Sequence, residues 1–77
     1  MTTNPDIIAV ENELHEAMLK FPPMRSPHEG LAIIQEEVFE LQTEVYKQHD
    51  CRHPSNMRHE AMQIAAMAIR FMMDCGK

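Results

Sequence analysis

The chain has 77 residues and a formal net charge of −5 with its histidines neutral. That acidic balance argues against binding to a nucleic-acid polymer, which requires a basic surface, and no apolar run reaches the ~18 residues that a membrane-spanning helix needs. A single domain of this size buries only roughly 60% of its unfolded surface, so we expect a metal, a disulfide framework or a partner chain to add stability.

The cysteine content and the N-terminal residues indicate the compartment. Two cysteines are too few for a disulfide framework, which leaves a metal or oligomerisation as the stabilising device. Residues 1–5 contain no basic segment followed by an apolar one, so we expect no signal peptide. A cytoplasmic protein with free thiols is therefore the expectation.

The first predicted helix covers about residues 5–20. Asn4 is a good N-cap residue and Pro5 suits the first helical position. Apolar residues then recur at helical spacing until the two prolines Pro22 and Pro23, which end the helix because proline cannot continue the hydrogen-bond ladder.

The second predicted helix has the clearest start and covers about residues 27–49. Ser26 and Glu29 have the spacing of a capping box, with Pro27 at the first helical position. Steps of three and four residues then define one apolar stripe. The stripe consists of Leu31, Ile34, Val38, Leu41 and Val45.

A polar loop over residues 49–54 leads to the third predicted helix, about residues 56–75, with Ser55 or Asn56 as its cap and Gly76 after its end. A short loop favours antiparallel neighbours, so the second and third helices should form a hairpin. The expected fold is all-α. It is a single domain over residues 1–77, a helical hairpin plus an N-terminal helix that assembles into an oligomeric bundle.

Several glutamates fall on or beside these apolar stripes. With ~100° per residue, Glu37 and Glu44 lie inside the stripe of the second helix, Glu40 lies at its edge and Glu36 mostly outside it. On the third helix, Glu60 lies within the apolar face. Unpaired carboxylates in such positions cost several kcal/mol by order of magnitude, so a compensating group is expected.

A hard divalent cation is one such group, because Mg²⁺ prefers oxygen ligands and facing helices can supply them. Glu37 and Glu40 are three residues apart on one helix face and can bind one ion together. The competing interpretation is an ordinary solvated acidic face, and oligomerisation could also bury these faces differently.

The acidic segments EExxE (residues 36–40) and ExxQ (residues 60–63), with their flanks over residues 26–74, resemble the MazG-like branch of the all-α nucleotide pyrophosphohydrolases. The EExxE box at residues 36–40 is followed, after nineteen residues, by an ExxQ at residues 60–63, where the family has ExxD. The segments SPHEGL (residues 26–31) and QIAAMAIRF (residues 63–71) are also similar to small members of the group. The resemblance implies Mg²⁺-dependent hydrolysis of nucleoside triphosphates to monophosphates and pyrophosphate, with Mn²⁺ as an alternative metal.

The resemblance also implies roles for individual residues. The metal ligands would be Glu37, Glu40 and Glu60, with Gln63 at the position of the family's aspartate, where a neutral amide weakens the site. Glu44 is the candidate that replaces the missing charge. Glu36 or Glu37 would orient the water that attacks the α-phosphorus.

Partners follow from the same resemblance. The substrate would be a nucleoside triphosphate, and the base pocket would be completed by another subunit, so we expect a homodimer or homotetramer. Lys47, Arg58 and Arg70 are candidates for phosphate binding, although each is more commonly an ordinary surface charge.

Two further interpretations remain open. Zinc binding is a weak one, because Cys51, His53, His59 and Cys75 are suitable ligand types without a tight ligand pair. A non-catalytic oligomerisation or partner-binding module is the main alternative, because the third helix is rich in methionine and alanine and Gln63 departs from the family's motif.

Overall fold

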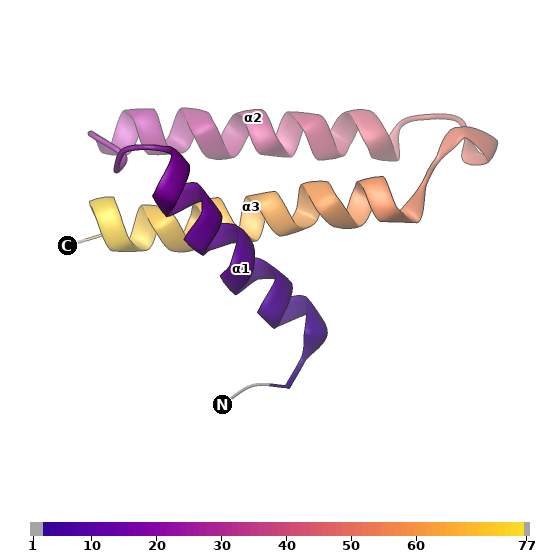
Figure 1. Ribbon diagram of the computed structural model, residues 1–77. Helices are drawn as coiled ribbons and strands as arrows, with labels where there is room; N and C mark the ends of the chain where they lie inside the picture. The colour runs from indigo at the N-terminus through magenta and orange to yellow at the C-terminus, as the bar shows by residue number, and fades with distance from the viewer. Residues whose placement is uncertain (1–2, 77) are drawn as a thin grey trace.

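The computed structural model describes residues 3–76 and is all-helical, as predicted (Figure 1). Helix α1 runs over Pro5–Lys20, α2 over Pro27–Val45 and α3 over Pro54–Cys75, and a 3₁₀ turn, η1, occupies His49–Cys51. Within these residues there is no β-strand, and none of the helices is both long enough and apolar enough to cross a membrane.

Helix α3 is central to the arrangement. It lies antiparallel beside α2, which confirms the predicted hairpin, and α1 crosses it diagonally (Figure 1). The contacts of α1 are with α3, and its N-terminal end projects away from the hairpin. Helix α3 is therefore the element that both of the other helices contact.

Helix α1 begins and ends as its sequence predicts. The Asn4 side-chain oxygen accepts hydrogen bonds from the backbone N–H groups of Asp6 and Ile7, at 2.8 and 3.3 Å. These contacts satisfy two of the N–H groups that a helix start leaves without an intrahelical partner.

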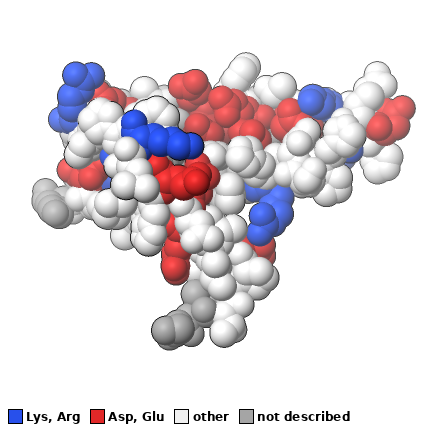
Figure 2. Space-filling model, viewed as in Figure 1, with Lys and Arg blue, Asp and Glu red and all other residues white. Residues whose placement is uncertain are grey.

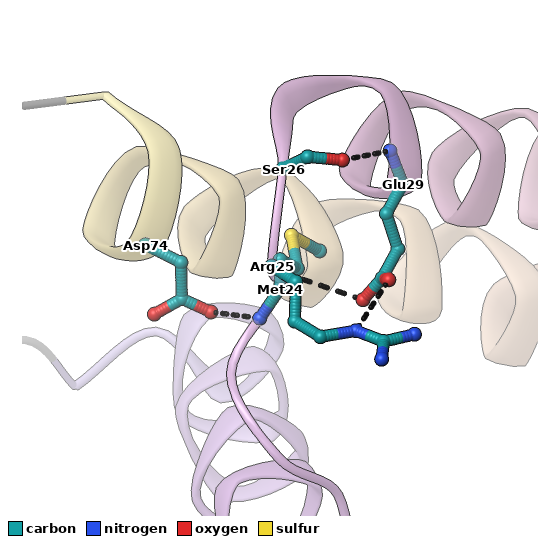
Figure 3. Close-up of polar contacts among 5 residues, drawn as sticks. All are labelled: Met24, Arg25, Ser26, Glu29 and Asp74. Atoms are coloured by element: carbon teal, nitrogen blue, oxygen red, sulfur yellow. Dashed lines mark hydrogen bonds and ion pairs between the residues drawn. The ribbon is translucent and has the colours of Figure 1, made fainter.

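The start of α2 is a variant of the predicted capping box (Figure 3). Ser26 Oγ accepts a hydrogen bond from the Glu29 N–H at 3.1 Å, as expected. The Glu29 carboxylate, however, accepts from the backbone N–H and Nε of Arg25, at 3.3 and 3.0 Å. These bonds lower the pKa of Glu29.

The loop between α2 and α3 corrects two predicted boundaries. Helix α2 ends at Val45 instead of near residue 49, because the apolar stripe stops there and a polar extension would gain no packing energy. Arg52 Nε then donates to the Lys47 carbonyl at 3.2 Å within the connection. Helix α3 starts at Pro54, two residues before the predicted start, since proline is preorganised for the first helical position.

The hydrophobic core is small and lies mainly between α1 and α3. Ala66 is completely buried, whereas the other core side chains keep some exposure. These other residues are Leu14, Ala17, Met24 and Met67. Helix α2 approaches α3 closely at Gly30, where an added Cβ would lie 2.6 Å from the Phe71 ring. The absence of a side chain at Gly30 therefore permits this helix contact.

Arg70 joins α1 and the following connection to α3. Its side chain is 5% exposed, and its guanidinium donates to the carbonyls of Ala17 and Phe21, at 3.0 and 2.8 Å. Asp74 lies 3.3 Å from Arg70 Nε and also accepts the Met24 N–H at 2.9 Å (Figure 3). Arg70, a candidate for phosphate binding, therefore has carbonyl and carboxylate partners within the chain.

Replacing Arg70 with Met should lower the free energy of unfolding by about 2 to 4 kcal/mol. The substitution leaves buried carbonyls and the Asp74 carboxylate without their donor. Urea denaturation followed by circular dichroism measures the change. Arg58→Met is the matched control, because Arg58 also links α3 to α1 but does so on the surface, where loss of the ion pair should cost less than about 1 kcal/mol. Equal losses in both variants would contradict the proposed importance of the buried contacts.

Candidate metal centre

Three glutamates from facing helices form one oxygen cluster. Glu37 and Glu40 project from α2 and Glu60 projects from α3, and one oxygen of each lies within 4.8 Å of the others. The two α2 residues share a face because they are three positions apart. Antiparallel pairing of the helices brings Glu60 to the same level. Three of the residues expected to be metal ligands therefore lie together, whereas Gln63 and Glu44 are not part of this group.

The cluster contains carboxylate oxygens that have no partner in the chain. Glu37 Oε2 and Glu60 Oε2 are shielded from solvent and lack a hydrogen-bond partner. Burial, together with the neighbouring Glu40 and Glu60, raises the pKa of Glu37 to about 7. Burial and contact with Glu40 also raise the pKa of Glu60. In both cases the charged form is disfavoured until a cation or a proton is supplied.

These oxygens fit a hard divalent cation. Mg²⁺ binds oxygen at ~2.1 Å, which places the ligands of an octahedral ion roughly 3 to 4 Å apart. The separations in the cluster, up to 4.8 Å, need only small side-chain adjustments to reach that range. The donor set consists of carboxylates alone, which favours Mg²⁺ or Mn²⁺ over metals that prefer nitrogen or sulfur.

Glu44 lies next to this cluster but has a basic partner. Its carboxylate is 2.9 Å from Lys47 Nζ, and this hydrogen-bonded ion pair lowers the pKa of Glu44. Glu44 is also close enough to raise the pKa of Glu60 through like-charge repulsion. Lys47, a candidate for phosphate binding, is occupied by the same contact.

Gln63 has a partner that the sequence analysis did not identify. Its Nε2 donates to Glu13 Oε1 on α1 at 2.7 Å, in a partly buried position. Glu13 lies three residues after Val10 and four before Ala17, so helical spacing placed it beside the apolar face of α1. That spacing was a usable signal, but the choice of Gln63 as a partner depends on how α1 crosses α3.

A cavity of about 470 Å³ lies beside the oxygen cluster, between α1, α2 and α3. Its walls include three of the acidic or amide candidates, Glu36, Glu37 and Gln63, and also Arg70. Two more glutamates, Glu13 and Glu29, also line it, and the rest is apolar, with Ala17, Phe21, Pro22, Met24, Ile33 and Met67. Acidic side chains gather over α2 and beside the crossing of α1 (Figure 2). The arrangement combines an apolar cavity with an acidic edge.

The remaining candidates lie elsewhere. Arg58 Nη2 pairs with Asp6 at 2.8 Å on the surface, away from the oxygen cluster. Cys51 is free in η1 and Cys75 is free at the last residue of α3, so the two lie near opposite ends of the hairpin. Over residues 3–76, they do not join His53 or His59 in a group with metal-ligand geometry. The zinc interpretation therefore has no support from the described geometry.

Comparison of the chain with protein-family models, with curated proteins and with solved structures finds no match.

In metal-free buffer, raising the pH from about 4.5 to about 7 should remove stability through Glu37. The pKa of Glu37 is about 7 in the folded chain and 4.5 as an isolated group, so the folded state binds more protons across this interval. We expect a loss on the order of 1 to 2 kcal/mol, allowing for solvent screening. Urea denaturation of the wild type and Glu37→Gln across the interval isolates this contribution, because other carboxylates are common to both. Parallel pH profiles would contradict the assignment.

Mg²⁺ should stabilise the wild-type chain, because a ligand that binds only the folded state raises the free energy of unfolding. The gain is ~2.7 kcal/mol at a free concentration of about 100 times Kd. Thermal denaturation with Mg²⁺ or with a chelator measures it. Glu37→Gln should abolish the response, whereas Glu11→Gln, an exposed α1 substitution with the same charge change, should retain it. A response in Glu37→Gln equal to that of the wild type would exclude this cluster as the site.

Proposed function

We propose that this chain binds Mg²⁺ through Glu37, Glu40 and Glu60 and hydrolyses nucleoside triphosphates to monophosphates and pyrophosphate. The observation that carries the proposal is the oxygen cluster, in which two shielded carboxylate oxygens lack any partner within the chain. The resemblance of the EExxE and ExxQ segments to MazG-like pyrophosphohydrolases supplies the reaction class.

The cavity beside the cluster supports a nucleotide as the substrate. Its volume of about 470 Å³ is within the usual range for small-molecule sites. Apolar side chains such as Ile33 and Met67 line the cavity and can contact a base, and a triphosphate directed toward Glu36 and Glu37 would reach the acidic edge. Bound Mg²⁺ would neutralise phosphate charge, which is otherwise repelled by the glutamates.

Glu36 is the residue best placed to orient the attacking water. It lines the cavity beside Glu37, is exposed, and is not one of the three clustered carboxylates. A carboxylate held there can accept a hydrogen bond from water and direct its lone pair toward the α-phosphorus. Glu37 would share this task from its position at the edge of the cluster.

Gln63 favours a second candidate function, a helical module that retains the fold without turnover. Its amide is neutral and donates to Glu13, so the position supplies no negative charge to a cation. In that case the acidic cluster would be a remnant and the exposed apolar surfaces would carry the function.

If the chain is an enzyme, we propose that it acts as a self-assembled oligomer. The free thiols of Cys51 and Cys75 suit the cytoplasm.

Pyrophosphate release from a panel of nucleoside triphosphates, with Mg²⁺ or Mn²⁺, tests the two candidates. We expect metal-dependent release by the wild type and a loss of at least about 100-fold in Glu37→Gln, as is typical when transition-state charge stabilisation is removed. Gln63→Asp should increase release because it adds a carboxylate beside the site. Glu11→Gln again provides the control with the same charge change.

The outcomes separate the two candidates. Release by Gln63→Asp alone would indicate a degenerate site on an intact scaffold. Silence from every variant, in samples shown to be folded, would reject the enzyme and favour the binding module.

A further inference from the structure

We propose that Glu13 on α1 accepts hydrogen bonds from the ribose hydroxyls of the bound nucleotide, so that the cavity selects ribonucleotides over 2′-deoxyribonucleotides. This role rests on the proposed function, because it takes the cavity beside the oxygen cluster as the nucleotide site. The family resemblance covers residues 26–74 and therefore assigns no role to Glu13.

The Glu13 carboxylate lines the cavity and has acceptor capacity to spare. The residue is half-buried, and its Oε1 accepts a hydrogen bond from Gln63 Nε2 at 2.7 Å. Over residues 3–76, no basic side chain forms an ion pair with Glu13. An ionised carboxylate accepts about four hydrogen bonds and donates none, so its remaining lone pairs need donors from water or from a ligand.

The three helices place their polar cavity residues at the same end of the cavity. Glu13 contacts Gln63 directly, which brings α1 and α3 together at this point. The close pair Glu40–Glu60 in the antiparallel hairpin then puts Gln63 about level with Glu37 on α2. The Glu13 carboxylate therefore lies at the end of the cavity that borders the oxygen cluster.

The cavity becomes apolar away from this end. One helical turn further along each helix, the lining residues are Ala17, Met67 and Ile33. Phe21 follows after another turn of α1, about 12 Å from Glu13 at ~1.5 Å per residue. It is the aromatic residue among the described cavity-lining side chains, and it is 63% exposed. An accessible aromatic ring in an apolar wall can stack on a nucleobase, so the base belongs at this end.

This polarity gives the nucleotide one direction in the cavity. With the base against Phe21 and the triphosphate at the edge formed by Glu36 and Glu37, the ribose lies between them, beside Glu13. The carboxylate would repel a phosphate, and Glu13 is not one of the three clustered carboxylates that would hold a cation. Two vicinal ribose hydroxyls, in contrast, supply the donors that a carboxylate needs.

Gln63 is a positioning residue in this arrangement. Its bond to Glu13 Oε1 holds the carboxylate in the cavity wall before a ligand arrives, which reduces the entropy lost on binding. A 2′-deoxyribonucleotide lacks one of the two hydroxyls and leaves the charged acceptor less satisfied. Loss of a hydrogen bond to a charged group should lower kcat/KM by about 10- to 100-fold.

Pyrophosphate release from each ribonucleoside triphosphate and its 2′-deoxy counterpart, with Mg²⁺, tests this role. The wild type should prefer the ribonucleotide of each pair by about 10- to 100-fold in kcat/KM. Glu13→Met removes both acceptor oxygens at similar side-chain length and should lose the preference. Glu11→Met is the matched control, because Glu11 is exposed and lies on the opposite side of α1, so it should keep the wild-type preference.

The ratio between the two sugars separates recognition from folding and from catalysis. Partial unfolding of a variant lowers release from both nucleotides of a pair equally, so the ratio reports the contact with the sugar. Release without a ribose preference in the wild type, or a preference that Glu13→Met retains, would overturn the role of Glu13 and leave hydrolysis standing.

Titration of the folded chain with each ribonucleoside and its 2′-deoxy counterpart, followed by NMR, decides the matter if no triphosphate is hydrolysed. Nucleosides carry no phosphate and need no metal, so their binding does not depend on the oxygen cluster. Tighter binding of ribonucleosides that Glu13→Met removes would support the role of Glu13 and reject hydrolysis alone. Equal binding of both sugars, or no binding, would overturn the role of Glu13 as well.

Discussion

The fold depends on the hydrogen bonds that Arg70 makes to the end of α1. The core between the helices is small, so packing alone leaves the crossing angle of α1 weakly determined. The Arg70 guanidinium joins the carbonyls of Ala17 and Phe21 to α3, and Asp74 extends the network to the Met24 N–H. This network positions α1 over α3 and thereby forms one wall of the cavity.

The hairpin separates two kinds of surface. One side carries the carboxylate cluster and the cavity, where burial of like charges raises the pKa of Glu37 and Glu60. The other side carries uncharged, exposed side chains such as Leu31 and Val38.

Stability and the candidate function oppose each other at the cluster. Without a cation, Glu37 and Glu60 each hold a shielded oxygen without a partner, which costs free energy in a chain with little core to offset it. Pairing of Glu44 with Lys47 shows the alternative, a carboxylate neutralised by a basic residue three positions further along the chain. The clustered glutamates lack such a neighbour, and this difference distinguishes them from an ordinary acidic surface.

Local rules in the sequence determined much of this protein. Helical periodicity predicted the helices, the short loop predicted the hairpin and the cap at Ser26 predicted the start of α2. Residue spacing placed Glu37 and Glu40 on one helix face, and the family resemblance grouped Glu60 with them. Only the tertiary structure decided that Gln63 binds Glu13 and that the guanidinium of Arg70 is used within the fold.

Sequence patterns did not predict these two contacts because each joins residues that are far apart along the chain. Capping and stripe formation depend on residues within about one or two helical turns, so they can be read directly from spacing. The Glu13–Gln63 contact joins residues 50 positions apart, and the Arg70–Ala17 contact joins residues 53 apart. Both depend on the angle at which α1 crosses α3, which no local pattern contains. The sequence by itself therefore determined the helices and the acidic row, and helix packing decided which polar groups are available to a ligand.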